Sequence, residues 1–304
     1  LIAADANKQR SLPGKEWNEI DHSETVSRAV KDYLATLDDE AFGAASPVVP
    51  KFISPADPAA QWTGALRGPA FFAYATNYTI DVKYSIILDV EASRAIRQAE
   101  VGAARTMIDR IEYRFDLKPQ RLAADTAYGS ASNLAWLVND KGIAPHIPVN
   151  DHSKRKDGTF SRHEFTFDKS RNIYKCPADK TMTTTGRIHT DNALRYLASV
   201  PDCRACPLKQ QCCPNMPARR IVRDVHEDAR DIARAIVNSP DYEQSRRERK
   251  KVEMAFAHLK RILKLGRLRL RGPSSVKDEF VLAATAQNLR KLAKLAPSNA
   301  YIAT

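Results

Sequence analysis

One stretch, residues 121–130 (RLAADTAYGS), constrains the fold of this chain more than any other. A short apolar run ends in an acid, Asp125, and the chain then turns through Gly129 into a helical pattern, with Ser130 or Ser132 as its N-cap. In α/β proteins a carboxylate is presented in this way at the carboxyl end of a buried strand, where such sheets bind their ligands. Because an acid that ends a strand commonly serves as a turn or cap residue, this motif alone does not establish a site.

A second acid, Glu253, lies in a predicted helix over residues 245–265. Helical spacing relates the apolar residues of this helix, which are Val252, Ala255, Phe256, Leu259, Ile262 and Leu263. Glu253 lies at the edge of the apolar stripe, and the cations Arg246, Arg249 and Lys260 share its face of the helix. A carboxylate within a row of cations, on a helix that packs against a core, suits a metal ion held beside a phosphate backbone.

The net charge of the chain is +12 at pH 7, and most of the excess lies in one segment. Between residues 245 and 271 there are eleven Lys or Arg and two Glu, a local balance of +9. The simplest interpretation of a basic helix is a solvated face. A segment that holds most of the excess charge favours a polyanionic partner instead, and nucleic acid is the default. No apolar run is long enough to span a bilayer.

The predicted elements describe an α/β protein. Residues 1–6 indicate the end of a strand, and residues 7–60 a polar excursion with one helix over 23–40. The elements expected after it are strands 71–81 and 84–90, helix 92–115, strand 122–124, helix 132–141 and strand 146–149, with helices 245–265 and 276–295 closing the chain. An antiparallel hairpin followed by parallel strands joined through helices gives a mixed sheet flanked by helices, which is the topology of the ribonuclease H-like fold.

Residues 150–235 interrupt this pattern and contain all five cysteines. Cys176 precedes a proline, Cys203 and Cys206 form a CxxC pair, and Cys212 follows them. Four thiolates with this spacing can bind one tetrahedral zinc ion, or another thiophilic metal, in a structural site. A small insertion that buries little core would gain stability from such an ion. The alternatives are reduced thiols without metal or a site degraded in this copy. The odd cysteine count argues for a reducing compartment and against a secreted disulfide framework.

Taken in order, these motifs resemble those of the DDE transposases of bacterial insertion sequences, in the branch with a cysteine-containing insertion before the last acid. Residues 124–130 (ADTAYGS) are similar to the second-acid motif of that family, and residues 249–260 (RKKVEMAFAHLK) to its Arg–Glu–Lys signature around the third acid. Residues 270–272 and 287–291 also resemble family segments. The resemblance covers most of residues 1–297. It implies the first part of a ribonuclease H-like domain over 1–149, truncated at its N-terminus, a Cys-rich insertion over 150–235, and C-terminal helices of the catalytic domain over 236–297.

Three departures from the family pattern affect the prediction. Ala127 stands where relatives often have Gly, and Arg246 stands where they have Tyr, which bears on a contact to DNA. In relatives the first acid ends the first strand, just before a segment like residues 1–6. We therefore expect the first catalytic carboxylate immediately upstream of Leu1. Asp57, which follows a Pro-containing turn instead of a strand, is the alternative first acid.

The resemblance implies metal-dependent cleavage of DNA at the ends of an insertion sequence, followed by strand transfer into target DNA. Three carboxylates would hold two Mg²⁺ or Mn²⁺ ions, with Asp125 and Glu253 as metal ligands. The residues expected to contact DNA phosphates are Arg246, Arg249, Lys260, Arg267, Arg269 and Arg271. A homodimer or larger synaptic assembly, no membrane, and a cytoplasmic, nucleoid-associated location in a bacterium are also implied.

Other functions are compatible with the same residues. A ribonuclease H-like nuclease would cut DNA without transposing it, and strand transfer of a pre-cleaved end separates the two activities. A non-catalytic, zinc-stapled DNA-binding remnant of a transposase is the alternative from a different class. A basic globular protein with two unrelated acids would leave the joint order of the motifs unexplained.

Overall fold

The computed structural model describes residues 1–24, 27–65, 68–151 and 155–295 and divides into two compact units. Unit 1 comprises residues 1–119 and 243–304, and unit 2 comprises residues 120–242. The contacts thus divide the chain at 119/120 and 242/243, whereas the predicted domains divide it at 149/150 and 235/236. As a result, the strand that precedes Asp125 belongs to the same unit as the five cysteines.

Unit 1 is built on a four-stranded antiparallel sheet in which the long strand β5 pairs with the other three. These strands are β1 (Ile2–Ala3), β4 (Gln61–Ala65), β5 (Gly68–Asp81) and β6 (Ile86–Arg94). The turn from β5 to β6 forms because the carboxylate of Asp81 accepts hydrogen bonds from the main-chain N–H groups of Lys83 and Tyr84, at 3.1 and 3.0 Å. The structure confirms both the predicted hairpin and the short strand near Leu1.

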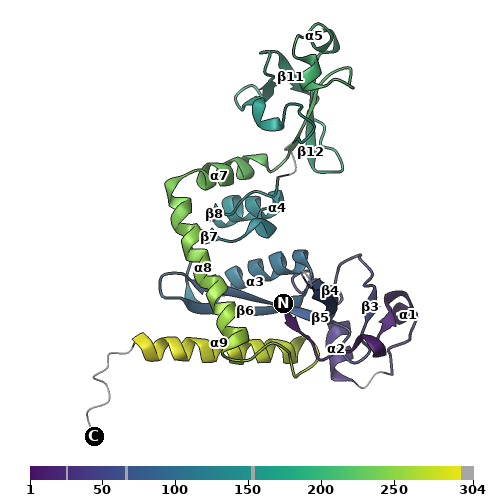
Figure 1. Ribbon diagram of the computed structural model, residues 1–304, viewed down its shortest axis with the longest axis vertical. Coiled ribbons are helices and arrows are strands. Elements are labelled where there is room, and N and C mark those ends of the chain that lie inside the picture. The colour runs from purple at the N-terminus through teal and green to yellow at the C-terminus, as the bar shows by residue number, and fades with distance from the viewer. Residues whose placement is uncertain (25–26, 66–67, 152–154, 296–304) are drawn as a thin grey trace. The chain divides into compact units, whose positions relative to one another are not determined.

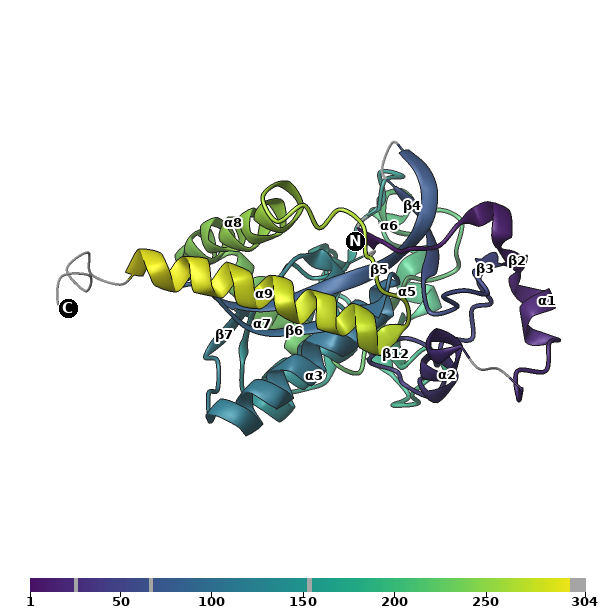
Figure 2. The same ribbon diagram turned by 90° about the horizontal axis from the view of Figure 1, so that it is seen from below.

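Helices lie on both faces of this sheet, as Figures 1 and 2 show. The helices are α3 (Arg97–Phe115), α8 (Pro240–Arg261) and α9 (Pro273–Leu295). Strand alternation explains the two faces. Phe72 and Tyr74 of β5 join a core with Leu259 of α8 and Phe280 of α9, whereas the Thr79 hydroxyl contacts the Met107 sulfur of α3 at 3.6 Å. The sheet is therefore enclosed, and it holds α8 in a defined orientation.

Residues 7–60 form more than a polar excursion, because they fold around a small core of their own. Its elements are η1 (Lys8–Arg10), β2 (Leu12–Pro13), α1 (Gly14–Asn18), α2 (Arg28–Ala35) and β3 (Phe52–Ile53). Trp17, Val30 and Ile53 are buried together and bring α1, α2 and β3 into contact. The helix predicted over 23–40 is present but shorter, since α2 begins at Arg28 and ends after Ala35, where Thr36 donates its hydroxyl to the Tyr33 carbonyl.

Unit 2 begins with the predicted strand–helix–strand arrangement. Its elements are β7 (Arg121–Ala123), η2 (Thr126–Tyr128), α4 (Ala131–Ala135), the π-helical turn η3 (Trp136–Lys141) and β8 (Ala144–His146). β7 and β8 pair in parallel, as expected, but among the described strands they form a two-stranded sheet of their own. An α/β protein is therefore confirmed, and the single mixed ribonuclease H-like sheet of the prediction is not confirmed.

The Cys-rich region forms an antiparallel sheet of five strands in unit 2. Its elements are η4 (Arg162–Glu164), β9 (Thr166–Asp168), β10 (Ile173–Lys175), β11 (Thr181–Thr184), β12 (Ala193–Ala198), α5 (Val200–Arg204), α6 (Lys209–Cys212) and β13 (Arg220–Asp224), followed by α7 (Glu227–Val237). The expectation that this insertion buries little core was wrong. Tyr174, Met182, Tyr196 and Ile221 are buried in one cluster, and the aromatic rings of Tyr174 and Tyr196 meet edge to face, 5.0 Å apart. Tyr196 and Ala198 of β12 and Ile221 of β13 point into this core, whereas their neighbours Leu197 and Val222 are exposed.

Across the described ranges, no helix combines the length and apolar character needed to cross a membrane.

Candidate functional site

Asp125 follows β7 after one intervening residue, Ala124, close to where the sequence predicts it. Its carboxylate caps the short helix η2 by accepting a hydrogen bond from the Ala127 N–H at 2.8 Å, and the residue is exposed. The turn that follows requires Gly129, because a Cβ there would lie 2.1 Å from the Pro148 carbonyl oxygen. Ser130, rather than Ser132, is the N-cap of α4. The cap contact orients Asp125 and leaves its carboxylate accessible from solvent.

Glu253 is exposed on α8, and three contacts within unit 1 fix the rotation of that helix. Phe256 stacks on Tyr78 of β5, with ring centroids 4.9 Å apart. Leu259 is fully buried, and Gln287 of α9 donates to the Ala255 carbonyl at 2.8 Å. Because these contacts occupy the inner side of α8, the Glu253 carboxylate faces solvent. Asp125 belongs to unit 2 and Glu253 to unit 1, so the surroundings of each acid are those of its own unit.

The cations predicted on the face of Glu253 differ in their surroundings. Arg246 is exposed and pairs with Glu243 at 2.9 Å, Arg249 is half-buried, and Lys260 is exposed.

Two of the three predicted arginines after α8 converge on one acid that the sequence analysis missed. Nη2 of Arg267 and Nη2 of Arg271 donate to the two carboxylate oxygens of Asp5, each at 2.8 Å. Partial burial alone would raise the pKa of Asp5, but the two guanidiniums hold it below its ordinary value. Arg269 is exposed, and its main-chain N–H donates to Glu279. No local pattern could reveal the Asp5 contact, since it joins residues more than 250 positions apart.

Asp57, the alternative first acid, is completely buried in unit 1. One carboxylate oxygen accepts hydrogen bonds from the Tyr74 hydroxyl at 2.5 Å and from the Gly272 N–H at 3.2 Å. Burial raises the pKa of Asp57 to about 6, although Tyr74 and Gly272 favour its charged form. A carboxylate without exposed surface cannot contact an ion that also touches DNA. The geometry therefore argues against a catalytic role and indicates that Asp57 holds Gly272 against β5.

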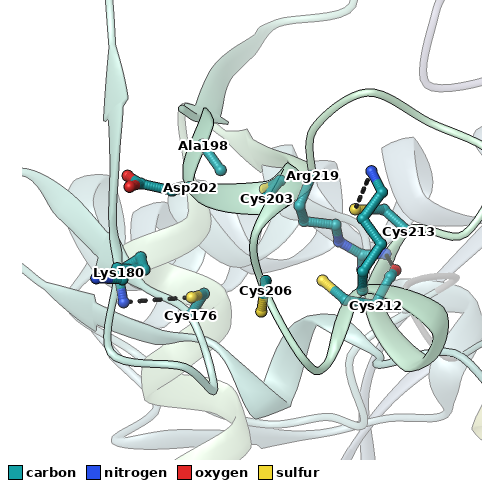
Figure 3. A pocket seen from close by; sticks show the side chains of 10 residues that line it. Cys176, Lys180, Ala198, Asp202, Cys203, Cys206, Cys212, Cys213 and Arg219 are labelled. Carbon is teal, nitrogen blue, oxygen red and sulfur yellow. Dashed lines mark hydrogen bonds between the residues drawn. The ribbon is translucent and has the colours of Figure 1, made fainter. Parts of the chain in front are cut away.

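All five cysteines line one small cavity in unit 2, as Figure 3 shows. They are Cys176, Cys203, Cys206, Cys212 and Cys213, and all are free thiols. The Cys176 sulfur accepts a hydrogen bond from the Lys180 N–H at 3.3 Å. Burial, and then the neighbouring Cys213, raise the pKa of Cys212 to about 12, so this thiol is neutral in the metal-free protein.

The thiols do not form a ready-made metal site. Within the part of the chain that the structure describes, no three His, Cys, Asp or Glu side chains are grouped closely enough to hold an ion. Thiol groups are suitable ligands for a thiophilic ion, but their positions around the cavity are too far apart for joint coordination. A zinc ion at Cys176, Cys203, Cys206 and Cys212 therefore stays a prediction.

Comparison with known proteins identifies the second part of the chain. Residues 175–293 match the family model described as a transposase DDE domain. No curated protein and no solved structure matches the chain. The matched range contains Glu253, the cations around it and the arginines after α8, and it begins just before Cys176. This match confirms the resemblance to DDE transposases over residues 175–293.

Proposed function

We propose that this protein is a DNA transposase that cleaves DNA at the ends of an insertion sequence and joins the freed end to target DNA. The observation that carries the proposal is the family match over 175–293, which contains an acid, Glu253, held exposed on a helix fixed to the core. The transposase family implies DNA as the substrate, and the concentration of cations in residues 245–271 agrees with a polyanion.

Asp125 and Glu253 act in this proposal as ligands of catalytic Mg²⁺ or Mn²⁺. Both side chains offer carboxylate oxygens to solvent, and hard divalent ions prefer such ligands. When bound, a pair of ions supplies the activated nucleophile and stabilises the leaving oxygen of an in-line displacement at phosphorus. Asp125 is oriented for this role by its bond to the Ala127 N–H, and Glu253 by the packing of α8.

The cations have the separate task of positioning the DNA backbone. Lys260 and Arg246 are exposed on α8, and Arg269 is exposed after it, so each can reach a phosphate. Such contacts give affinity and register but carry little sequence information. As in the family, a homodimer or larger assembly would bring two DNA ends together.

The test is nicking of a supercoiled plasmid in Mg²⁺ and, separately, in Mn²⁺. We expect Asp125→Asn and Glu253→Gln each to lower the nicking rate by about a hundredfold or more, because a lost metal ligand removes several kcal/mol of transition-state stabilisation. DNA binding, measured by anisotropy, should remain nearly intact. Asp140→Asn in unit 2 and Asp278→Asn in unit 1 make the same charge change at other exposed acids and serve as matched controls.

Nicking that survives both site substitutions, or that does not need a divalent ion, would remove these acids from the mechanism. Strand transfer separates the transposase from a nuclease. A pre-cleaved oligonucleotide that carries the element end should be joined to plasmid DNA, and cleavage without joining would favour the nuclease.

A further inference from the structure

The segment between α8 and α9 is held rigidly, so its arginines have defined positions. The Leu268 N–H donates to the Ala3 carbonyl at 2.7 Å, and the Leu268 side chain is buried. At the other end, the Gly272 N–H donates to the buried carboxylate of Asp57 at 3.2 Å. Between these anchors, the N–H groups of Arg269 and Leu270 donate to Glu279 of α9, at 2.8 and 2.5 Å. The side chains of Arg267 and Arg271 therefore project from a backbone segment that is anchored at both ends.

The two guanidiniums grip a single carboxylate at the surface. Each oxygen of Asp5 accepts from one of them at 2.8 Å, and Arg271 also donates through Nε to the Asp5 main-chain carbonyl at 3.1 Å. The side chains of Arg267, Arg271 and Asp5 are 64%, 49% and 34% exposed. Exposed ion pairs contribute little to stability, so this carboxylate can be displaced at small cost.

A phosphodiester presents the same features as the Asp5 carboxylate, namely one negative charge shared between two oxygens. Guanidinium groups bind both anions through paired N–H donors. Lys264 and Arg269 are exposed nearby in sequence, within the segment of +9 net charge, so a phosphate would meet a positive potential on approach. Asp5 thus occupies the position that a DNA phosphate would take between Arg267 and Arg271.

We propose that Arg267 and Arg271 form a phosphate-binding clamp and that Asp5 is its internal counter-ion, which DNA must displace. This inference rests on the proposed function, because it assumes that the face binds a nucleic-acid backbone. In this proposal Asp5 competes with DNA for the two arginines, whereas a residue that only oriented them would support DNA binding. Removing the Asp5 charge should strengthen DNA binding, whereas loss of a purely orienting contact should weaken it.

The experiment measures binding of a 30-base-pair duplex of arbitrary sequence by fluorescence anisotropy, over a series of KCl concentrations. Asp5→Asn removes the charge and keeps the size of the side chain. Asp5→Ser removes the same charge without introducing a side-chain amide, and serves as a second variant if Asp5→Asn does not fold. Asp38→Asn makes the same change of net charge at an exposed acid elsewhere in unit 1. Thermal melts show that each variant is folded.

For Asp5→Asn we expect the slope of log K against log salt to become steeper by about one unit, because one more cation becomes available to a phosphate. The affinity gain over the parent should then be about three- to fourfold larger at about 50 mM salt than at about 200 mM. Asp38→Asn should leave the slope unchanged. In an Arg267→Gln, Arg271→Gln background the effect of Asp5→Asn should disappear, because the clamp is gone.

The outcomes separate this inference from the proposed function. If the parent protein binds DNA and Asp5→Asn binds no more tightly than Asp38→Asn, or more weakly, Asp5 is a structural partner and the clamp is refuted. If neither the parent nor any variant shows salt-dependent binding, the DNA-binding function fails, and the clamp fails with it. A gain that persists in the double-glutamine background would show that Asp5 acts through general charge, which also overturns the clamp.

Discussion

Asp57 provides the sharpest test of the structure, because its environment predicts a stability change of definite sign. The carboxylate is fully buried in unit 1, its Oδ1 accepts from Tyr74 and Gly272, and its Oδ2 has no hydrogen-bond partner among the described residues. Burial raises its pKa to about 6, from an ordinary value of 3.8. Two charged residues from other segments also act on this pKa: Arg271 lowers it and Asp5 raises it.

The sign follows from proton binding. Because the pKa is higher in the folded state, the native protein binds more protons than the unfolded chain between about pH 4 and pH 6, and stability falls as pH rises through that window. A shift of about two units is worth about 3 kcal/mol in total. Between about pH 4.5 and pH 7.5, a range in which most of the titration occurs, the difference is about 2 kcal/mol.

Asp57→Asn removes this titration while keeping an oxygen that can accept from Tyr74 and Gly272. We therefore expect the free energy of unfolding of the variant, relative to the parent, to rise by about 2 kcal/mol between about pH 4.5 and pH 7.5. Urea unfolding followed by tryptophan fluorescence measures it. A Trp136→Phe background leaves Trp17 and Trp62, both in unit 1, as the reporters. Asp38→Asn, an exposed acid, is the control. A difference between Asp57→Asn and its parent that stays constant across this pH range would refute the reasoning.

Two further predictions concern unit 2. Burial alone would raise the pKa of Glu227, but ion pairs with Arg162, Arg230 and Arg234 lower it to about 2. The contribution of Glu227 to the stability of unit 2 is therefore complete above about pH 4.5 and is lost as pH falls towards 2. Glu227→Gln should destabilise unit 2 by about 3–5 kcal/mol at neutral pH, since it leaves buried arginines without their counter-charge, and chemical denaturation followed by Trp136 measures it. For the cysteines, we expect metal analysis of the purified protein to find about one thiophilic ion per chain, retained in Cys213→Ser and lost in Cys206→Ser.

Clear results would contradict each of these. An unfolding free energy of Glu227→Gln within about 0.5 kcal/mol of the parent would mean that the buried ion pairs contribute no more than an ordinary surface site. Metal-free protein with five thiols that react freely with a thiol reagent would leave the cysteines as reduced residues of the unit 2 core.

The sequence alone indicates a large part of the architecture. The alternation in residues 71–81 predicts β5, and helical spacing predicts α8 and α9. The predicted apolar stripes are buried only in part: Leu259 of α8 and Phe280 of α9 lie in the core, whereas Ile262 of α8 and Leu289 of α9 are exposed. The turn after Asp125 is also readable, since Gly129 and Ser130 are the residue types that a close approach and an N-cap require.

Other features depend on contacts between distant segments, and no periodicity reports them. The sequence does not show that β7 and β8 pair only with each other among the described strands, or that residues 166–224 build a sheet with its own aromatic core.

The clearest case is the segment after α8. The sequence shows that this segment is rich in arginine and predicts that Arg267, Arg269 and Arg271 contact DNA phosphates. Only the tertiary structure decided what they meet: β1 places Asp5 between Arg267 and Arg271, and the buried Asp57 holds Gly272. The physical reason is that charge and hydrogen-bond partners are chosen by distance in space, whereas periodicity records only which side of an element is buried.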